Sequence, residues 1–307
     1  MNIGQLLELA MHKLTAGSAA RREAEILLCH ALEVKRSFLY ANPGMGVPRQ
    51  RQACFQRLLR RRVQGMPIAY LTGIHGFWSL DLRVTPAVLI PRPETELLVE
   101  KALELIPAGA RQRLADLGTG CGAIALALAR ERPHCEIHAT DCSLDALHVA
   151  GDNARRHQLE QVQFHHGSWT NPLSGRFDLI VSNPPYIAQT DPHLQQGDCR
   201  FEPRLALSPG ADGLSALRQI AAEVHELLVE GGWLLLEHGY DQAAAVRSIL
   251  EAAAYSDIAT YRDLAGIERI CVGRSRPSLA SAAPVHPCTL AAGGLCERFR
   301  KWNLTPE

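Results

Sequence analysis

A glycine-rich stretch near the middle of the chain decides its fold: Asp116-Leu117-Gly118-Thr119-Gly120-Cys121-Gly122. The apolar run before it, 113–117, is typical of a buried strand, and the alanine- and leucine-rich run after it, 123–129, is typical of a helix. Glycines between a strand and a helix let the backbone turn sharply and approach a ligand, which the free N–H groups of the helix can bind. The sequence therefore predicts a cofactor-binding loop in an α/β domain.

The glycine spacing and its neighbours distinguish between two cofactor classes. Dinucleotide enzymes favour Gly-x-Gly-x-x-Gly, whereas this loop reads Gly-x-Gly-x-Gly and follows Asp116, which would repel a phosphate. A carboxylate at that position suits a cationic or zwitterionic ligand, such as the amino-acid part of S-adenosylmethionine. Asp141 ends the next predicted strand, where a carboxylate can accept hydrogen bonds from ribose hydroxyls of either cofactor. The loop alone therefore favours S-adenosylmethionine.

Short apolar segments alternate with helical ones after the loop, which predicts a mostly parallel sheet with helices on both faces. The last two strand candidates are too close together for an intervening helix, so we expect them to form an antiparallel hairpin at the edge of the sheet. The strand candidates are 113–117, 136–140, 162–164, 179–182, 233–236, 258–261 and 269–272.

Four regions are predicted along the chain. Residues 1–70 carry apolar stripes at helical spacing, such as the one formed by Ile3, Leu6, Leu7 and Ala10, and we expect a small helical bundle. Residues 71–95 alternate as a strand does and are interpreted as a β-hairpin linker, with Thr95 as the cap of the following helix. The catalytic domain is expected over 96–275, and the Ser-, Ala- and Pro-rich 276–307 is expected to be a poorly ordered tail.

A second motif, Asn183-Pro184-Pro185-Tyr186, directly follows the predicted strand that ends at Ser182. Two consecutive prolines fix the backbone as it leaves the sheet. The carboxyl ends of strands are where open α/β sheets bind ligands. A rigid asparagine amide beside an aromatic ring suits a flat polar target, such as a carboxamide or an exocyclic amine. Together the two motifs predict a methyltransferase.

Composition narrows the classes of partner. The 32 basic and 32 acidic residues give a formal net charge of +0, which argues against a surface built to neutralise many phosphates. The nine cysteines show no zinc spacing, and we expect them to be reduced thiols in a cytoplasmic protein, with no metal site. No apolar run approaches 18 residues and the N-terminus resembles no signal peptide, so neither a membrane span nor secretion is expected.

With these motifs the sequence resembles the bacterial protein-(glutamine-N5) methyltransferases that modify peptide chain release factors, the PrmC/HemK family. The resemblance covers residues 1–274 and is most specific at the linker segment Pro91-Arg92-Pro93-Glu94-Thr95-Glu96 and at the Asn183 motif. Further matching segments are 21–28, 118–122, 181–187, 191–194, 201–203 and 236–239. The resemblance implies a class I S-adenosylmethionine-dependent methyltransferase fold, with a Rossmann-like seven-stranded sheet whose last strand is antiparallel. It also implies methylation of the glutamine in the Gly-Gly-Gln loop of class I release factors.

The resemblance also implies roles for individual residues. The methionine part of the cofactor would contact Gly118, Thr119, Gly120, Cys121 and Gly122; Asp141 would bind its ribose and Trp169 its adenine. Asn183 would touch cofactor and substrate, and Asn183, Pro184 and Tyr186 would act in catalysis. Pro184, Pro185 and Tyr186 would frame the substrate amide. Ser168 departs from the family, which often has aspartate there, and we do not include it in the predicted site.

Other functions have to be weighed against this one. A methyltransferase acting on adenine N6 in DNA would use the same loop and the same amide-aromatic clamp on a flipped base. The balanced charge and the lack of a recognisable groove-reading domain count against it, so no nucleic-acid substrate is expected. A nicotinamide-dependent oxidoreductase is opposed by the glycine spacing, and a non-catalytic module that only binds release factors is opposed by the intact cofactor loop and Asn183.

Overall fold

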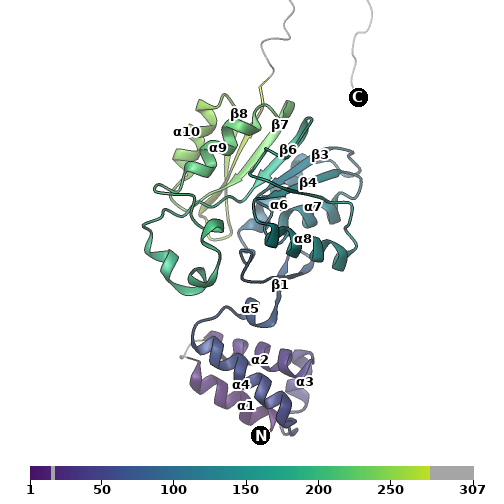
Figure 1. Cartoon of the computed structure of the whole chain (residues 1–307), viewed down its shortest axis with the longest axis vertical. Coiled ribbons are helices and arrows are strands. Elements are labelled where there is room, and N and C mark those ends of the chain that lie inside the picture. Colours follow the sequence, from purple (N-terminus) through teal and green to yellow (C-terminus); the bar gives the residue numbers. More distant parts are fainter. Residues whose placement is uncertain (15–17, 277–307) are drawn as a thin grey trace, which may run out of the picture. The chain divides into compact units, whose positions relative to one another are not determined.

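A single twisted sheet organises the larger part of the chain in the computed structural model, which describes residues 1–14 and 18–276 (Figure 1). The predicted tail over 276–307 lies outside the described residues, apart from Arg276. The strands of the sheet are β3 (Arg113–Leu117), β4 (Glu136–Asp141), β5 (Gln163–His166), β6 (Phe177–Ser182), β7 (Leu228–Glu237), β8 (Ser256–Arg262) and β9 (Glu268–Arg274).

The strand order is β5-β4-β3-β6-β7-β9-β8. The pairs from β5 to β7 are parallel, while β9 is antiparallel to both β7 and β8. The predicted fold class, a mostly parallel seven-stranded sheet with an antiparallel last strand, is therefore confirmed. The two late strands do form a hairpin at one edge, with β8 outermost and β9, the last in sequence, lying inside.

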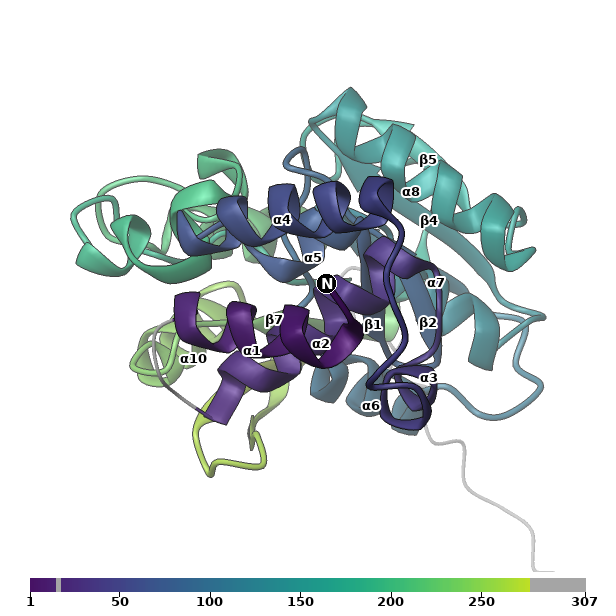
Figure 2. The same ribbon diagram turned by 90° about the horizontal axis from the view of Figure 1, so that it is seen from below.

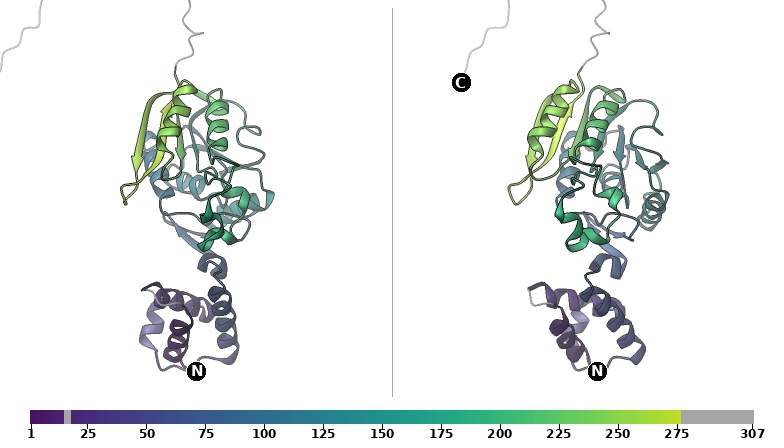
Figure 3. Two further views of the ribbon diagram at one scale, coloured as in Figure 1. Left: turned by 90° about the vertical axis from the view of Figure 1, so that its left-hand side faces the viewer. Right: turned by 60° about the vertical axis from the view of Figure 1, so that its left-hand side comes forward.

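Helices cover both faces of this sheet (Figure 3). On one face α6, α7 and α8 bury side chains such as Leu98, Leu126 and Val149 against β3, β4 and β6. On the other face α9 and α10 bury Ile220 and Val246 against the alternate residues of β3 and β6 and against β7. Strands buried on both faces require nearly continuous apolar runs, as β6 and β7 have. The bounds are α6 (Thr95–Leu105), α7 (Ala123–Glu131), α8 (Leu144–His157), α9 (Ser215–Val224) and α10 (Ala243–Ala252).

The N-terminal helices pack around their own apolar core (Figure 2). Their bounds are α1 (Ile3–Lys13), α2 (Ser18–Leu32), α3 (Arg36–Ala41), α4 (Arg49–Val63) and α5 (Ile68–Thr72). Asn2 and Gln5 form a reciprocal capping box that satisfies N–H groups at the start of α1. The stripe expected on α1, formed by Ile3, Leu6, Leu7 and Ala10, supplies this core together with apolar side chains of α2 and α4. Two short helices, α3 and α5, lack a long periodic stripe and are not predicted by the sequence.

The linker contains an antiparallel pair, β1 (Ile74–Phe77) and β2 (Leu80–Arg83). The expected strand is thus interrupted by a tight turn, in which Trp78 takes a φ of 55°. The expected helix cap at Thr95 is wrong: Glu94 occupies the N-cap, and Thr95 is the first residue of α6, with its side chain 3% exposed. Three short 3-10 helices that the sequence does not reveal lie between β6 and α9: η1 (Pro192–Gln195), η2 (Gly197–Phe201) and η3 (Arg204–Ala206).

Candidate active site

The two motifs meet where the strand order of the sheet reverses. From β3 the chain proceeds to β4 and β5 on one side, while β6 pairs with the other side of β3. Leu117 and Ser182 are register partners at the carboxyl ends of β3 and β6, and the Ser182 hydroxyl donates to the Leu117 carbonyl at 2.7 Å. The glycine loop and the Asn183 loop therefore leave the sheet side by side, at the position where such folds bind their ligands.

The glycine loop is held against β4 by its own backbone. The N–H groups of Gly118 and Thr119 both donate to the Thr140 carbonyl at 2.9 Å. Gly118 has a φ of +75° and Gly120 of +57°, a region that side-chain-bearing residues avoid. A Cβ on Gly118 would lie 3.1 Å from Cζ3 of Trp169, whereas a Cβ on Gly120 would meet open space. The absence of a side chain at Gly118 thus lets the Trp169 ring pack closely against the loop, and Gly120 leaves room for a ligand.

Asp116 lies fully buried beneath the loop. Its Oδ2 accepts hydrogen bonds from the Thr119 hydroxyl at 2.6 Å and from the Ala125 N–H at 3.2 Å. Its Oδ1 has no partner among the described residues. Burial, with a smaller contribution from the charge of nearby Asp141, raises the pKa of Asp116 to about 7, and the two hydrogen bonds oppose that increase. Such a carboxyl favours a nearby cation, because a cation would stabilise its ionised form.

Asp141 lies at the end of β4 and lines the cavity described below. Its Oδ2 accepts from the Gly120 N–H and its Oδ1 from the Ser143 N–H, both at 2.9 Å. Burial raises the pKa of this carboxyl, and the N–H bonds oppose that increase. The backbone bonds fix the carboxylate between the loop and the start of α8, and each oxygen keeps a further lone pair for a ligand hydroxyl.

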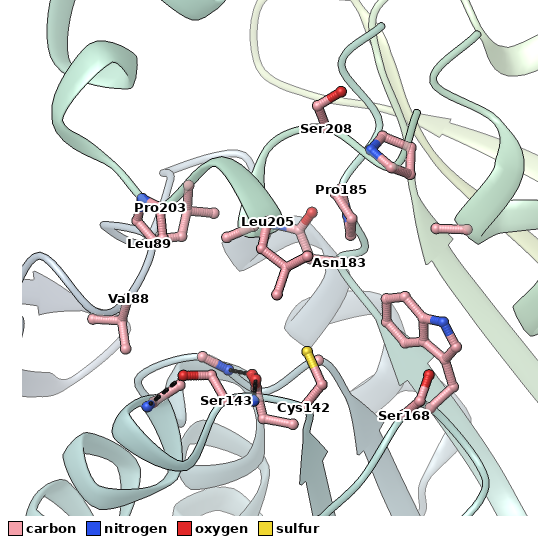
Figure 4. Close-up of a pocket in the computed structure, with 18 of the residues that line it drawn as sticks. Val88, Leu89, Cys142, Ser143, Ser168, Asn183, Pro185, Pro203, Leu205 and Ser208 are labelled. Carbon is pink, nitrogen blue, oxygen red and sulfur yellow. Dashed lines mark hydrogen bonds between the residues drawn. The ribbon is translucent and has the colours of Figure 1, made fainter. Parts of the chain in front are cut away.

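A cavity of about 380 Å³ opens between these elements, within the range of small-molecule sites (Figure 4). Figure 4 shows Asn183, Pro185 and Ser168 around the same cavity as Cys142 and Ser143. The structure brings six of the predicted site residues to its wall: Gly118, Gly120, Asp141, Trp169, Asn183 and Pro185.

The other predicted residues do not line the cavity. Thr119 is buried and donates to Asp116, and Cys121 is buried, which raises the pKa of its thiol to about 12. Gly122 is the N-cap of α7, where a Cβ would come within 3.3 Å of Leu126 and Ala150. Pro184 is buried, and Tyr186 turns its hydroxyl toward Glu237. These residues shape the two loops, and their assignment to ligand contacts stays a prediction.

Several cavity residues are absent from the sequence prediction. Cys142 and Ser143 follow Asp141 directly, and Ser168, which the prediction set aside, also lines the cavity. Residues 87–89 of the linker also line the cavity. So do some of residues 203–209, which lie between β6 and α9, and some residues of α9 itself. For Cys142 and Ser143 the sequence offers one indication of a position at the cavity, because they directly follow Asp141. The other residues reach the cavity only because distant segments of the chain fold over the sheet.

Hydrogen bonds define how the Asn183 loop is held. Asn183 Nδ2 donates to the Thr95 hydroxyl oxygen at 3.0 Å, and the Tyr186 hydroxyl donates to Glu237 Oε1 at 3.1 Å. The Tyr186 carbonyl accepts from Gln242 Nε2 at 2.9 Å. Burial raises the pKa of the Tyr186 phenol well above its ordinary value, and the charge of Glu237 adds to the increase, so this hydroxyl stays a donor.

The linker is fixed to the other side of the cavity by an ion pair. Arg92 binds the fully buried carboxylate of Glu202, which also accepts from the Ile90 N–H at 3.0 Å. Burial raises the pKa of Glu202, and the Arg92 charge opposes that increase. The pair joins segments that flank Leu89 and Pro203, both of which line the cavity.

Comparison with known proteins decides the family. Residues 5–73 match the family model "PrmC N-terminal domain", and residues 93–198 match "Methyltransferase small domain". A release factor glutamine methyltransferase of Xylella fastidiosa strain Temecula1 is 52% identical over 83% of this chain and 93% of its own length. The chain belongs to the release factor glutamine methyltransferase family. The Escherichia coli K12 member is 47% identical over 86% of this chain and 96% of its own length.

Solved structures support the fold of this family member. A 16S rRNA N2 G1207 methyltransferase of Thermus thermophilus, solved with AdoMet and guanosine, is similar with a TM-score of 0.51 and 20% identity. The match covers 66% of this chain and 50% of the other. At that identity the likeness concerns the fold alone. Family and fold together confirm the predicted enzyme class, the predicted family and S-adenosylmethionine as cofactor, and they do not favour the DNA adenine alternative.

The residues of this methyltransferase fit that cofactor. The unpartnered Asp116 Oδ1 offers an acceptor for an ammonium group, and the space above Gly120 admits a ligand close to the backbone. Asp141 is placed to accept ribose hydroxyls, and the Trp169 ring provides an apolar wall. A separate observation concerns membranes: across 1–14 and 18–276, helices of the length and apolarity required to cross a bilayer are absent.

Proposed function

We propose that this methyltransferase transfers a methyl group to the side-chain nitrogen of the glutamine in the Gly-Gly-Gln motif of class I peptide chain release factors. The observation that carries the proposal is Asn183, which lies at the cavity wall beside the glycine loop with its Nδ2 bound to Thr95. Its Oδ1 accepts no hydrogen bond from the described residues and is available for a substrate N–H. The relatives' shared name supports the choice of a release factor as substrate.

An amide nitrogen is a poor nucleophile because its lone pair is delocalised into the carbonyl group. We assign the Asn183 Oδ1 and the Pro184 carbonyl oxygen as acceptors for the two protons of the glutamine NH₂. Preorganised acceptors orient the nitrogen toward the methyl group and stabilise the positive charge that grows on it during transfer. When bound, S-adenosylmethionine supplies an activated methyl group, whose C–S bond breaks as the N–C bond forms and whose sulfur leaves as a neutral thioether. The methylated nitrogen then loses one proton to water.

The remaining predicted roles are part of the same proposal. Asp116 would bind the ammonium group of the cofactor, Asp141 its ribose and Trp169 its adenine. Pro185 would frame the substrate amide, and Tyr186 would pack on the amide plane, although its ring is not among the residues that line the cavity. Thr119, Cys121 and Gly122 would act through the shape of the glycine loop.

The proposal also assigns functions to the larger divisions of the chain. Residues 1–70 would dock on a surface of the release factor remote from the glutamine, residues 71–95 would link, and residues 96–275 would carry the reaction. The reaction would take place in the cytoplasm and would act on translation termination, because release factors work on ribosomes.

A labelled-methyl assay tests this function. The enzyme is incubated with methyl-labelled S-adenosylmethionine and either a class I release factor, the same factor with the motif glutamine replaced by glutamate, or double-stranded DNA. We expect label on the intact factor, located by peptide mass spectrometry at the motif glutamine. Label on the glutamate variant to the same extent, or on DNA adenine instead, would overturn the proposal.

A further inference from the structure

The formal charge of this chain is distributed unevenly between its N-terminal helices and the remainder. Residues 1–70 contain 11 basic and 4 acidic residues, a formal net charge of +7. Residues 71–307 contain the other 21 basic and 28 acidic residues, a formal net charge of −7. The overall charge of +0 therefore conceals a basic N-terminal region and an acidic remainder. An asymmetry of this kind indicates a charged partner for one part of the chain.

Helix α4 (Arg49–Val63) carries more than half of the basic residues of this region. It contains six arginines and no carboxylate. Its buried side chains are Phe55, Leu58 and Leu59. Four of the arginines are exposed on the opposite side of the helix, over a length of about 18 Å at 1.5 Å per residue. We call these four residues the arginine face of α4: Arg49, Arg57, Arg60 and Arg61.

The carboxylates of the chain do not neutralise the arginine face. The other two arginines of α4 are only partly exposed, and each forms an ion pair within the N-terminal helices. Arg51 binds Glu33, and Arg62 binds Glu23, both at 2.7 Å. Over residues 1–14 and 18–276, none of the ion pairs involves the arginine face, whose Arg57 reaches only the Cys54 sulfur at 3.8 Å. The face is therefore open to carboxylates from outside the chain.

The stability of α4 does not account for the whole arginine face. Arg60 and Arg61 lie in the last turn, where the helix dipole favours cations. Arg49 is the first residue of the helix, where the dipole disfavours a cation, and the first turn holds no acidic residue. Arg57 lies three and four positions before Arg60 and Arg61, so these like charges repel one another. An acidic partner would relieve both of these costs.

Two observations favour a protein over a nucleic acid as that partner. The exposed positions of α4 carry no aromatic side chain on which an unpaired base could stack. The net charge of −7 on residues 71–307 would repel a long polyanion that extends beyond the N-terminal helices. An acidic patch on a folded protein, in contrast, can be confined to the area of one helix.

We propose that the arginine face of α4 binds an acidic surface of the release factor. Each guanidinium can donate a forked pair of hydrogen bonds to one carboxylate. The inference rests on the proposed function, because it identifies the residues with which the N-terminal region would dock on that substrate. The contact would increase the affinity and the encounter rate for the whole release factor in a salt-dependent way, without any contribution to the cavity.

A quadruple variant of the full-length enzyme tests the proposal: Arg49→Gln/Arg57→Gln/Arg60→Gln/Arg61→Gln. Glutamine has a helix propensity close to that of arginine, so α4 should be retained, and thermal unfolding checks that the variant is folded. The matched control removes the same charge from four exposed arginines outside the N-terminal helices, none of which forms an ion pair in the described part of the chain: Arg111→Gln/Arg130→Gln/Arg156→Gln/Arg276→Gln.

The specificity constant kcat/KM on a whole class I release factor at low salt should fall by about 10- to 100-fold in the arginine-face variant, because each exposed ion pair contributes about 1.5- to 5-fold. The difference from the parent should shrink to less than about 3-fold in about 0.5 M salt, which screens exposed charges. Activity on a short Gly-Gly-Gln peptide and the dissociation constant for S-adenosylmethionine should stay within about 2-fold of the parent values, because the face does not line the cavity. The control variant should match the parent on both substrates.

Photo-cross-linking provides a measurement that is independent of turnover. Benzoylphenylalanine in place of Arg57 should cross-link to a segment of the release factor rich in aspartate and glutamate, identified by mass spectrometry. The same group in place of Arg130 should give no such product. Cross-links from position 57 to a segment without acidic residues would contradict the proposed chemistry.

The remaining outcomes separate this inference from its alternatives. Equal losses of activity on the peptide and on the whole release factor would overturn it. Retention of labelled single-stranded RNA by the parent and not by the arginine-face variant, with methylation of the release factor unchanged, would assign the face to nucleic acid instead. A parent enzyme that fails to methylate the release factor would refute the proposed function. A parent and an arginine-face variant that methylate it equally well at low salt would refute the docking inference alone.

Discussion

Replacing Asp116 by asparagine should increase stability at high pH while weakening cofactor binding. The asparagine Oδ1 can keep the two hydrogen bonds that Asp116 accepts from Thr119 and Ala125. The substitution removes a carboxyl that is fully buried and whose pKa is raised from 3.8 to about 7, chiefly by burial. It also removes the acceptor that we assign to the ammonium group of the cofactor.

The sign of the pH dependence follows from these two pKa values. Between about pH 4 and pH 7 the native carboxyl binds a proton that the unfolded chain has released, so the free energy of unfolding of the parent protein falls as pH rises. The difference of about 3 between the pKa values corresponds to an upper limit of about 4 kcal/mol above pH 7. Unsatisfied N–H groups of the new amide offset about 1–3 kcal/mol of the gain at every pH.

Thermal unfolding of both proteins at pH 5 and pH 8 provides the measurement. The advantage of Asp116→Asn should grow by up to about 3 kcal/mol between the two pH values, because most of the interval between the pKa values lies in that range. Calorimetric titration with S-adenosylmethionine should show weaker binding by the variant.

The matched control is Asp263→Asn. Hydrogen bonding from the Ile267 N–H lowers the pKa of Asp263, and the Arg269 charge contributes to the decrease, so its ionised form stabilises the native state. That stability is present above the unfolded pKa and is lost as pH falls, so this control should lose stability at pH 8. An Asp116→Asn advantage that is equal at both pH values, or that shrinks toward pH 8, would refute the reasoning.

Three further predictions concern the two loops and the N-terminal region. Asn183→Ala should reduce turnover by about 10²- to 10³-fold with little change in cofactor affinity; loss of cofactor binding with turnover preserved would disprove its role. Gly118→Ala should weaken S-adenosylmethionine binding, because the new Cβ would lie 3.1 Å from Trp169. The control is Gly109→Ala, at a position with a similar φ and open space around it, which should lower the free energy of unfolding only by the backbone cost of about 1–2 kcal/mol. Deletion of residues 1–70 should reduce activity on a whole release factor more than on a short Gly-Gly-Gln peptide, and equal losses would contradict the docking role.

Local sequence patterns were sufficient for the fold and for the two loops of the site. The apolar runs, the glycine spacing and the double proline each specify the backbone near themselves, so the positions of Gly118 and Asn183 at adjacent strand ends follow from strand order. The other residues that complete the site cannot be predicted from local sequence patterns and strand order. The Val88–Leu89 side of the cavity is fixed by a pairing between Arg92 and Glu202, which are 110 positions apart.

One residue with two possible uses, Thr95, is predicted wrongly. A threonine before an apolar run usually caps a helix, but Thr95 lies one position inside α6, where its hydroxyl is free to reach Asn183. Glu237 lies in the segment 236–239 that matches the family, but only its burial and the hydrogen bond from Tyr186 show that it holds the Asn183 loop. The sequence shows which hydrogen-bonding groups exist, and the packing of distant elements determines which of them meet.

The position of β9 has a consequence for synthesis of the chain. This strand is the last in sequence, yet it lies between β7 and β8. While the ribosome is still adding residues 268–274, β7 has no neighbour on that side and β8 has no partner at all, so unpaired strand edges are exposed on the nascent chain. Such edges favour pairing with other chains. A message that ends before codon 268 should therefore yield an aggregating product rather than a merely inactive one, although every residue that lines the cavity would already have been made.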